Sequence, residues 1–203
     1  RVWFDTNNSS TINGGESGVN NVRVRLYASD GVTEILVGPD GILNTADDAV
    51  GGMLTAGGGY YRFNNLLAGD YVVVIPSTNF GTGGTLRGYW SSATTISAAG
   101  VISETTAALA NSDTDSDDNG TLSSGTVISS VVTLGPTITS EPAGETNLSG
   151  GQGQPDRQAN MTVDFGFYRV AIGNLVYLDN NFNGTYDGGA PDTLVSGASV
   201  RLY

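Results

Sequence analysis

The chain has 203 residues, of which 30 are glycine and only 14% are charged. This much glycine disfavours a helical bundle, because each glycine in a helix interior costs about 1 kcal/mol relative to alanine. The formal net charge of −12 at pH 7 opposes binding to nucleic acid or anionic lipid. Cations are therefore the expected small partners.

Cysteine, histidine and lysine do not occur in the sequence. Disulfides, thiolate and imidazole metal sites, a Ser-His-Asp triad and Lys-to-Asn crosslinks are therefore excluded within this chain. No stretch approaches the roughly 18 apolar residues of a membrane span, so no membrane insertion is expected. The chain begins inside a strand-like segment without an initiator Met or a signal peptide, and we expect it to be a piece of a longer secreted precursor.

Short strands separated by Gly, Asn and Asp turns follow one another along the chain. Residues 22–27 alternate apolar and polar side chains, which predicts a half-buried strand with two arginines on its wet face. Residues 60–63 and 71–75 flank a turn-rich segment and are expected to pair as a hairpin, and residues 127–134 and 161–168 are expected to be two more strands. A short helix over residues 103–110 is an open alternative, and residues 81–84 and 141–156 are expected to be loops. This pattern predicts an all-β fold, a β-sandwich with long loop insertions.

The end of the sequence repeats its beginning. Residues 1–7 align with residues 175–181 when Asp5 is placed on Asp179, a shift of 174 residues. After an insertion of two residues, Val24-Arg-Leu-Tyr27 recurs as Val200-Arg-Leu-Tyr203. The interpretation is one repeat over residues 1–169, followed by the opening strands of the next repeat over residues 170–203. A tandem array is the natural parent.

Three segments carry a family resemblance. Val2-Trp-Phe-Asp-Thr-Asn-Asn8, residues 59–74 and Asn160-Met-Thr-Val-Asp-Phe-Gly-Phe-Tyr168 resemble, in this order, the opening, the central hairpin and the closing strand of the B-type repeats of bacterial serine-aspartate repeat surface adhesins. The resemblance implies a prealbumin-like or Ig-like β-sandwich, calcium in the Asp/Asn loops, and a secreted stalk or fibre role.

Two loops at equivalent places in the repeat have the oxygen-ligand spacing with which a continuous loop wraps Ca²⁺. The candidate ligands of the second loop are Asp179, Asn181, Asn183, the Thr185 carbonyl and Asp187, with Gly184 at the turn position. Position 12 of this loop is Ala190, so Asp192 must reach in or water must fill the gap. The candidate ligands of the first loop are Asp5, Asn7, Ser9, the Thr11 carbonyl, Asn13 and Glu16, with Ser10 in place of the turn Gly. The alternative is an Asn-rich connection whose side chains only cap backbone amides.

Two further acidic loops are candidate cation sites. One contains Asp113, Asp115, Asp117 and Asn119, and its closely spaced carboxylates either bind a divalent ion or stay solvated. The other contains Asp40, Asp47 and Asp48, and a β-turn at residues 39–41 explains the same residues without a metal.

Carboxylate pairs also serve glycosidases, but here the Asp clusters lie in turn-forming contexts, so we do not expect an enzyme. Tyr89 and Trp90 lie in the long insertion and are candidate contacts for a ligand such as a glycan.

The leading hypothesis is an extracellular structural repeat of a bacterial surface stalk, adhesin or fibre, rigidified by Ca²⁺ and assembling head to tail. Its partners are neighbouring repeats or identical chains, because the opening strands over residues 170–203 have no core of their own. They are expected to pack against a following repeat, either covalently linked or through strand donation from another chain. The alternative is a glycan- or host-ligand-binding module carried on such a stalk.

Overall fold

The computed structural model describes residues 1–110, 116–136 and 158–203. The chain divides into two compact units, Arg1–Arg169 and Val170–Tyr203. Regular structure in the described residues consists of β-strands and one short 3₁₀ helix, η1 (Ser77–Asn79), so the all-β prediction is confirmed. No helix in these described ranges is both long and apolar enough to cross a membrane.

The first sheet of the first unit has three strands and carries the start of the chain. Its central strand is β12 (Phe165–Tyr168), which lies between β1 (Val2–Phe4) and β6 (Trp90–Ser91). β1 runs parallel to β12, with Trp3 opposite Gly166, whereas β6 runs antiparallel to it. The first strand of the unit is thus held by the last one.

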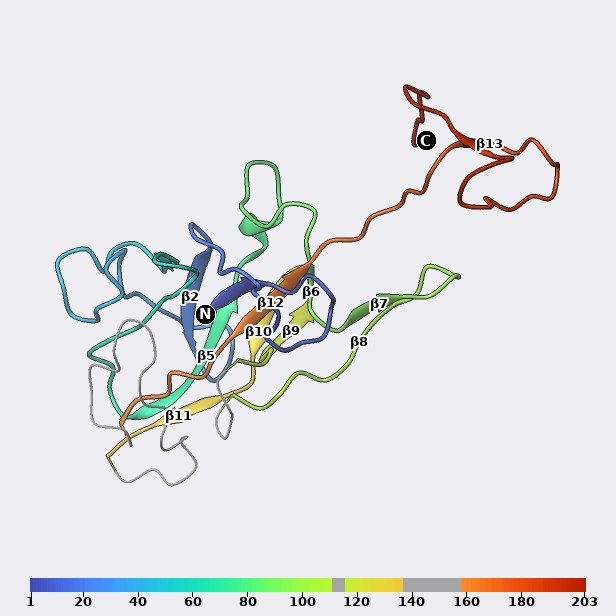
Figure 1. Cartoon of the computed structure of the whole chain (residues 1–203). Helices are drawn as coiled ribbons and strands as arrows, with labels where there is room; N and C mark the ends of the chain where they lie inside the picture. Colours follow the sequence, from blue (N-terminus) through green and yellow to red (C-terminus); the bar gives the residue numbers. More distant parts are fainter. Residues whose placement is uncertain (111–115, 137–157) are drawn as a thin grey trace. The chain divides into compact units, whose positions relative to one another are not determined.

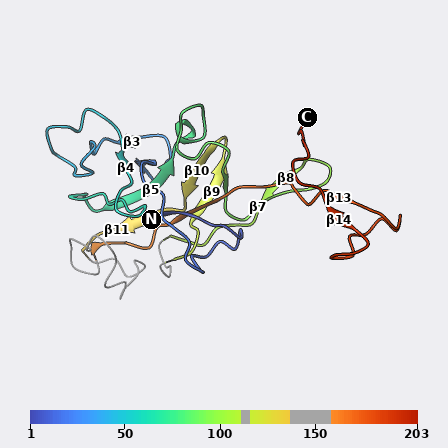
Figure 2. The same ribbon diagram turned by 45° about the horizontal axis from the view of Figure 1, so that its top comes forward.

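The second sheet is centred on β5 (Gly69–Ile75), whose side chains are mostly buried. β5 pairs antiparallel with β2 (Arg23–Ala28) and, on its other edge, with β10 (Thr126–Ser129) and β11 (Val132–Leu134). Around these strands lie β3 (Glu34–Ile35), β4 (Met53–Leu54) and β9 (Gly120–Ser123). Figures 1 and 2 show these strands around β5.

The apolar core is built by alternating side chains of these strands. Val24 and Leu26 of β2 are buried while the neighbouring arginines are half-buried, as the alternation predicts. Phe165 and Phe167 of β12 are fully buried in the same hydrophobic cluster. A second side-chain layer above a sheet removes apolar surface from water and supplies most of the stabilisation of such folds.

Two smaller hairpins complete the fold. In the first unit, β7 (Thr94–Ile96) pairs with β8 (Ile102–Glu104) and extends away from the sheets in both views (Figures 1 and 2). In the second unit, β13 (Tyr177–Leu178) pairs antiparallel with β14 (Thr193–Leu194).

Several predicted elements differ from the structure. Residues 60–63 form no strand, and β5 pairs with β2, β10 and β11 instead. The helix alternative over residues 103–110 is wrong, because its beginning belongs to β8. Of residues 161–168 only Phe165–Tyr168 is a strand. Residues 81–84 form a loop as expected, and residues 141–156 lie within the segment 137–157 that is not described.

The predicted strand over residues 127–134 is split by a one-residue bulge between β10 and β11. At the break, the Ser129 hydroxyl accepts a hydrogen bond from the Val73 N–H at 3.0 Å. The side chain thus replaces the missing carbonyl partner, which is why a buried strand tolerates the interruption.

Candidate functional site

The first candidate loop begins at Asp5, directly after β1, and this carboxylate is fully buried. Its Oδ1 accepts a hydrogen bond from the Ser9 N–H at 2.9 Å, and its Oδ2 accepts one from the Ser10 N–H at 2.8 Å. The Ser92 hydroxyl, next to β6, donates to the same Oδ2 at 2.8 Å. Asp5 therefore shapes the loop and ties it to the first sheet.

The remaining polar groups of this loop converge. The Asn13 amide donates to Ser9 Oγ at 2.8 Å and to the Thr11 carbonyl at 2.9 Å, while the Asn7 amide donates to Asn13 Oδ1 at 3.3 Å. Glu16 closes the loop, because its two carboxylate oxygens accept the Thr6 N–H at 2.7 Å and the Asn13 N–H at 3.1 Å. All six predicted positions thus belong to one connected set of contacts.

The second loop, in the second unit, repeats most of these internal hydrogen bonds. Asp179 accepts the Asn183 N–H at 3.1 Å and the Gly184 N–H at 2.7 Å, as Asp5 accepts Ser9 and Ser10. The Asp187 carboxylate receives the side-chain amides of Asn181 at 2.7 Å and Asn183 at 3.1 Å. The sequence repeat is therefore also a repeat of local structure.

Asp192 takes the closing role that Glu16 has in the first loop. Its oxygens accept the Asn180 N–H at 3.0 Å and the Asp187 N–H at 3.1 Å, which are the amides equivalent to Thr6 and Asn13. Asp192 is buried, although most of its neighbours are exposed. The shorter side chain reaches in from two residues farther along, which is the first of the two alternatives that the sequence left open.

The backbones of the two loops also match at two left-handed positions. Asn8 and Phe182 at the fourth position have φ of 56° and 60°, and Ser10 and Gly184 at the sixth have φ of 60° and 77°. Glycine is the usual residue at such angles, because a Cβ is crowded there. Ser10 thus adopts the turn without the expected glycine.

In the third loop, three carboxylates surround one hydroxyl. Thr45 Oγ1 lies 2.6 Å from an oxygen of Asp47, 3.2 Å from one of Asp48 and 3.5 Å from one of Asp40. This hydrogen bond from Thr45 lowers the pKa of Asp47. A hydroxyl has one proton to donate, so Thr45 can donate a hydrogen bond to only one of the three carboxylates at a time. The predicted residues of this loop are therefore brought together. The turn alternative also holds, because the Gly41 N–H donates to the Gly38 carbonyl at 3.3 Å.

Part of the fourth acidic segment lies beside the first loop. Thr11 forms an isolated antiparallel bridge with Asp117, and the Asp118 N–H donates to the Ser10 carbonyl at 3.0 Å. Asp113 and Asp115 lie outside the described residues. Two candidate regions separated by about a hundred residues in the sequence are thus neighbours in the fold.

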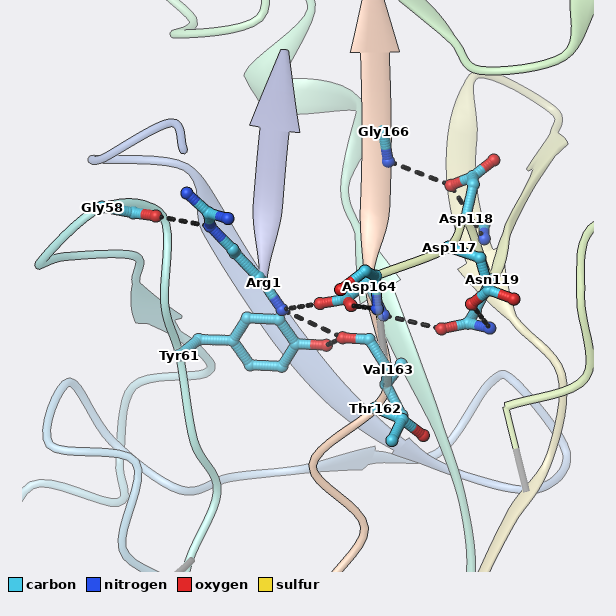
Figure 3. A network of polar contacts seen from close by, with 12 residues as sticks. Arg1, Gly58, Tyr61, Asp117, Asp118, Asn119, Thr162, Val163, Asp164 and Gly166 are labelled. Atoms are coloured by element: carbon cyan, nitrogen blue, oxygen red, sulfur yellow. Dashed lines mark hydrogen bonds and ion pairs between the residues drawn. The ribbon is translucent and has the colours of Figure 1, made fainter. Parts of the chain in front are cut away.

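Asn119 is held in the protein interior and connects this segment to β12. Its Oδ1 accepts the Asp164 N–H at 2.7 Å, and its backbone N–H donates to the Asp164 carbonyl at 2.9 Å (Figure 3). The side chain is fully buried, and its amide lies 3.4 Å from the Ala108 carbonyl. These contacts favour a structural role for Asn119 over the predicted role as a ligand.

The network of Figure 3 also holds the buried carboxylate of Asp164 between distant segments. The Asp164 carboxylate accepts hydrogen bonds from the backbone nitrogen of Arg1 at 2.5 Å (Figure 3) and from the Ser116 N–H at 3.0 Å. Beside it, the Tyr61 hydroxyl donates to the Val163 carbonyl at 2.8 Å, and burial, with the charge of Asp164, raises the pKa of Tyr61 well above its ordinary value. Sequence analysis missed Asp164, although it is the single acid in the strand predicted over residues 161–168.

Asp118 is the second buried acid that sequence analysis missed. One of its oxygens accepts the Gly166 N–H at 3.0 Å (Figure 3) and the Gly120 N–H at 3.2 Å. Burial raises the pKa of Asp118 well above its ordinary value, and the negative charges of Glu104 and Asp5 add to this effect. The folded protein therefore favours the protonated carboxyl.

Asp118→Asn is expected to stabilise the calcium-free protein at neutral pH. At a pH between the pKa of Asp118 in the unfolded chain and its raised pKa in the folded chain, the unfolded chain has released a proton that the folded chain keeps. The free energy of unfolding of the wild type therefore falls as pH rises through this range. Asn cannot ionise. In chelator, the melting temperatures of the wild type and of Asp118→Asn should thus nearly coincide near pH 4, and the variant should melt at the higher temperature toward pH 7.

The control for this measurement is Asp30→Asn. Hydrogen bonds from Thr33 lower the pKa of the exposed Asp30, so this variant should show no gain as pH rises. Equal stability of the wild type and Asp118→Asn at pH 7 would contradict the conclusion that burial and neighbouring negative charges raise the pKa of Asp118.

The aromatic candidates are less open than predicted. The Tyr89 ring stacks on Phe4 with centroids 4.8 Å apart, and the Arg169 guanidinium lies 3.9 Å from the Tyr89 ring centroid. Trp90 is half-buried and pairs with Tyr168 in the first sheet. The Tyr89 ring thus already has a partner ring and a cation against it, which argues against its predicted role as a ligand contact.

Within residues 1–110, 116–136 and 158–203, no three or more acidic side chains are grouped so that they could hold a metal by themselves. A cation in these loops would therefore also need amide, hydroxyl or carbonyl oxygens as ligands, which Ca²⁺ accepts. No known family model matches the chain, and no curated protein matches it.

Proposed function

We propose that this chain is an extracellular structural repeat of a bacterial surface stalk, adhesin or fibre, stiffened by Ca²⁺ in its Asp/Asn loops. One observation carries the proposal: two loops 174 residues apart in alignment have the same pattern of internal hydrogen bonds, centred on Asp5 and on Asp179. Two copies of one loop geometry in one chain indicate a shared local task.

The oxygen groups of each loop suit a hard cation. Ca²⁺ takes six to eight oxygen ligands from carboxylates, amides, carbonyls and water. An Asn amide presents either its oxygen or its nitrogen after a half turn, so groups that now hydrogen-bond one another can face an ion instead. In the first loop these groups would be Asp5, Asn7, Ser9, the Thr11 carbonyl, Asn13 and Glu16. In the second they would be Asp179, Asn181, Asn183, the Thr185 carbonyl, Asp187 and Asp192.

The expected effect of the ion is mechanical and electrostatic. A bound cation offsets repulsion in a chain with a formal charge of −12, and it reduces the conformational freedom of the loops that follow β1 and β13. Loops of this kind, repeated along an array, would stiffen a stalk. The contacts of the Tyr89 ring with Phe4 and Arg169 argue against its use as a glycan platform.

A calcium titration followed by backbone NMR tests the proposal, with Ser10 and Gly184 reporting separately on the two loops. Asp187→Ala should weaken calcium binding to the second loop, followed at the Gly184 amide, by at least about tenfold. The variant removes a carboxylate ligand, and a tenfold loss of affinity corresponds to about 1.4 kcal/mol of binding free energy. The Asn180 side chain instead donates to the Pro191 carbonyl at 2.7 Å, so Asn180→Ala is the matched control.

We expect Asn180→Ala to retain most of the affinity and Ser10 to respond normally in both variants. If neither reporter responds to millimolar calcium, the proposal is wrong.

A further inference from the structure

The second unit reproduces the strand pair that opens the first unit. In the first unit, Trp3 bridges Gly18, and the Val19 N–H donates to the Val2 carbonyl at 2.8 Å. In the second unit the equivalent residues do the same: Tyr177 pairs with Leu194, and the Val195 N–H donates to the Val176 carbonyl at 2.9 Å. β13 is therefore the structural counterpart of β1.

The other edge of β1 shows what this counterpart lacks. There, the Phe165 N–H donates to the Arg1 carbonyl at 2.8 Å, and the Asp5 N–H donates to the Phe167 carbonyl at 2.8 Å. The N–H of Asp179, equivalent to that of Asp5, has no hydrogen-bond acceptor within the described part of the chain. The second unit thus presents an unpaired strand edge.

The apolar side chains beside this edge are uncovered as well. Val2 is 0% exposed in the first unit, whereas its counterpart Val176 is 41% exposed. Leu26 is 2% exposed, whereas Leu202 is 84% exposed. The same sequence pattern is a core in one unit and an open surface in the other.

We propose that the edge of β13 is a docking site for a parallel strand of the pattern aromatic-Gly-aromatic, the closing strand of a repeat that opens with residues 170–203. The register follows from β1 and β12: the aromatic residues lie opposite Val176 and Leu178, and the glycine lies opposite Tyr177. This proposal rests on the proposed role as a structural repeat and specifies its partner.

The strand chemistry follows from how β12 fits its own partner. A Cβ at Gly166 would lie 2.7 Å from the Trp3 ring and 2.3 Å from Ser92 Oγ, so a large aromatic residue in the opening strand requires a glycine opposite it. Phe165 and Phe167, on either side of this glycine, lie in the same buried cluster as Val24 and Leu26. Val200 and Leu202, the counterparts of Val24 and Leu26, would be buried by equivalent aromatic side chains of a docked closing strand.

An intact second copy of this chain is not the occupant. Its β12 is the central strand of its sheet, with β1 on one edge and β6 on the other. Donating β12 would break both pairings and expose Phe165 and Phe167, which are fully buried. The occupant is therefore a closing strand that is not yet paired with an opening strand of its own.

A chimera tests this assignment. A copy of residues 28–169 is appended after Tyr203, which occupies the place of Tyr27, and hydrogen exchange is measured at the Asp179 amide. Exchange should slow by at least about a hundredfold relative to the original chain, because the amide gains a carbonyl partner inside a sheet. The control chimera ends after the copy of residue 158 and lacks the closing strand; there, exchange at Asp179 should remain fast.

A second arm does not depend on folding of the appended segment. A peptide with the sequence of residues 159–169 is added in excess to the original chain, and a peptide with both Phe positions changed to Asp is its control. Only the first peptide should slow exchange at Asp179. The proposal would be overturned if exchange at the Asp179 amide stayed fast with both the chimera and the peptide. It would also be overturned if the control chimera slowed this exchange as much as the full chimera. Calcium responses at Ser10 in the same samples test the proposed function separately, so the two failures are distinguishable.

Discussion

Calcium is expected to raise the melting temperature of the first unit by about 5–10 °C over the chelator-treated protein. A site that binds only the folded state adds about 2.7 kcal/mol when free calcium is about a hundredfold above the dissociation constant. For a domain of this size, 1 kcal/mol corresponds to about 2–4 °C. The measurement is a thermal melt of the full chain, followed by near-UV circular dichroism, in chelator and in calcium.

Two variants of equal charge change make this test specific. Glu16→Gln keeps one oxygen in the closing position of the first loop but removes its charge, so most of the calcium-dependent rise should disappear. Asp30→Asn removes a charge from an exposed turn outside the loops, where Asp30 accepts the Val32 and Thr33 N–H groups. Its calcium response should equal that of the wild type. Equal melting temperatures with and without calcium in the wild type would count against the ion.

Phe165→Ala is expected to lower the free energy of unfolding of the first unit by about 3–5 kcal/mol. Phe165 is fully buried in β12, its ring centroid is 6.4 Å from that of Tyr61, and it lies in the cluster that joins both sheets. Truncation leaves a cavity that neighbours held in two sheets cannot fill. Urea denaturation at fixed calcium measures the difference.

Phe182→Ala is the matched control for this cavity. Phe182 is 90% exposed in the second candidate loop, so the same truncation removes almost no buried surface. Its effect should stay within about 0.5 kcal/mol. A loss for Phe165→Ala no larger than that of Phe182→Ala would mean that β12 does not close the core of the first unit.

Features that depend on neighbours in the sequence were predictable from it. The alternation in residues 22–27 predicted which side chains of β2 are buried, because successive residues of a strand face opposite sides. The spacing of Asp, Asn and Ser in the two loops predicted which polar groups converge, because one short loop connects them. For the position of Ala190 the sequence left two alternatives, Asp192 or water, and the structure has the Asp192 carboxylate in the closing position.

The pairing of distant segments was decided only by the tertiary structure. An apolar run predicts that a strand is buried but does not name its partner, so the expected pairing of residues 60–63 with β5 was wrong. The contacts of the Tyr89 ring likewise come from Phe4 and Arg169, near the two ends of the first unit, which lie far apart in sequence.

The two buried acids show the same division. Asp118 and Asp164 are ordinary carboxylates in the sequence, and their burial arises only when residues 116–120 pack against β12. Local spacing determines which groups one loop can gather, since the chain itself holds them together. Burial, shifted pKa values and strand partners depend on surfaces that meet across many residues, and these emerge only when the sheets assemble.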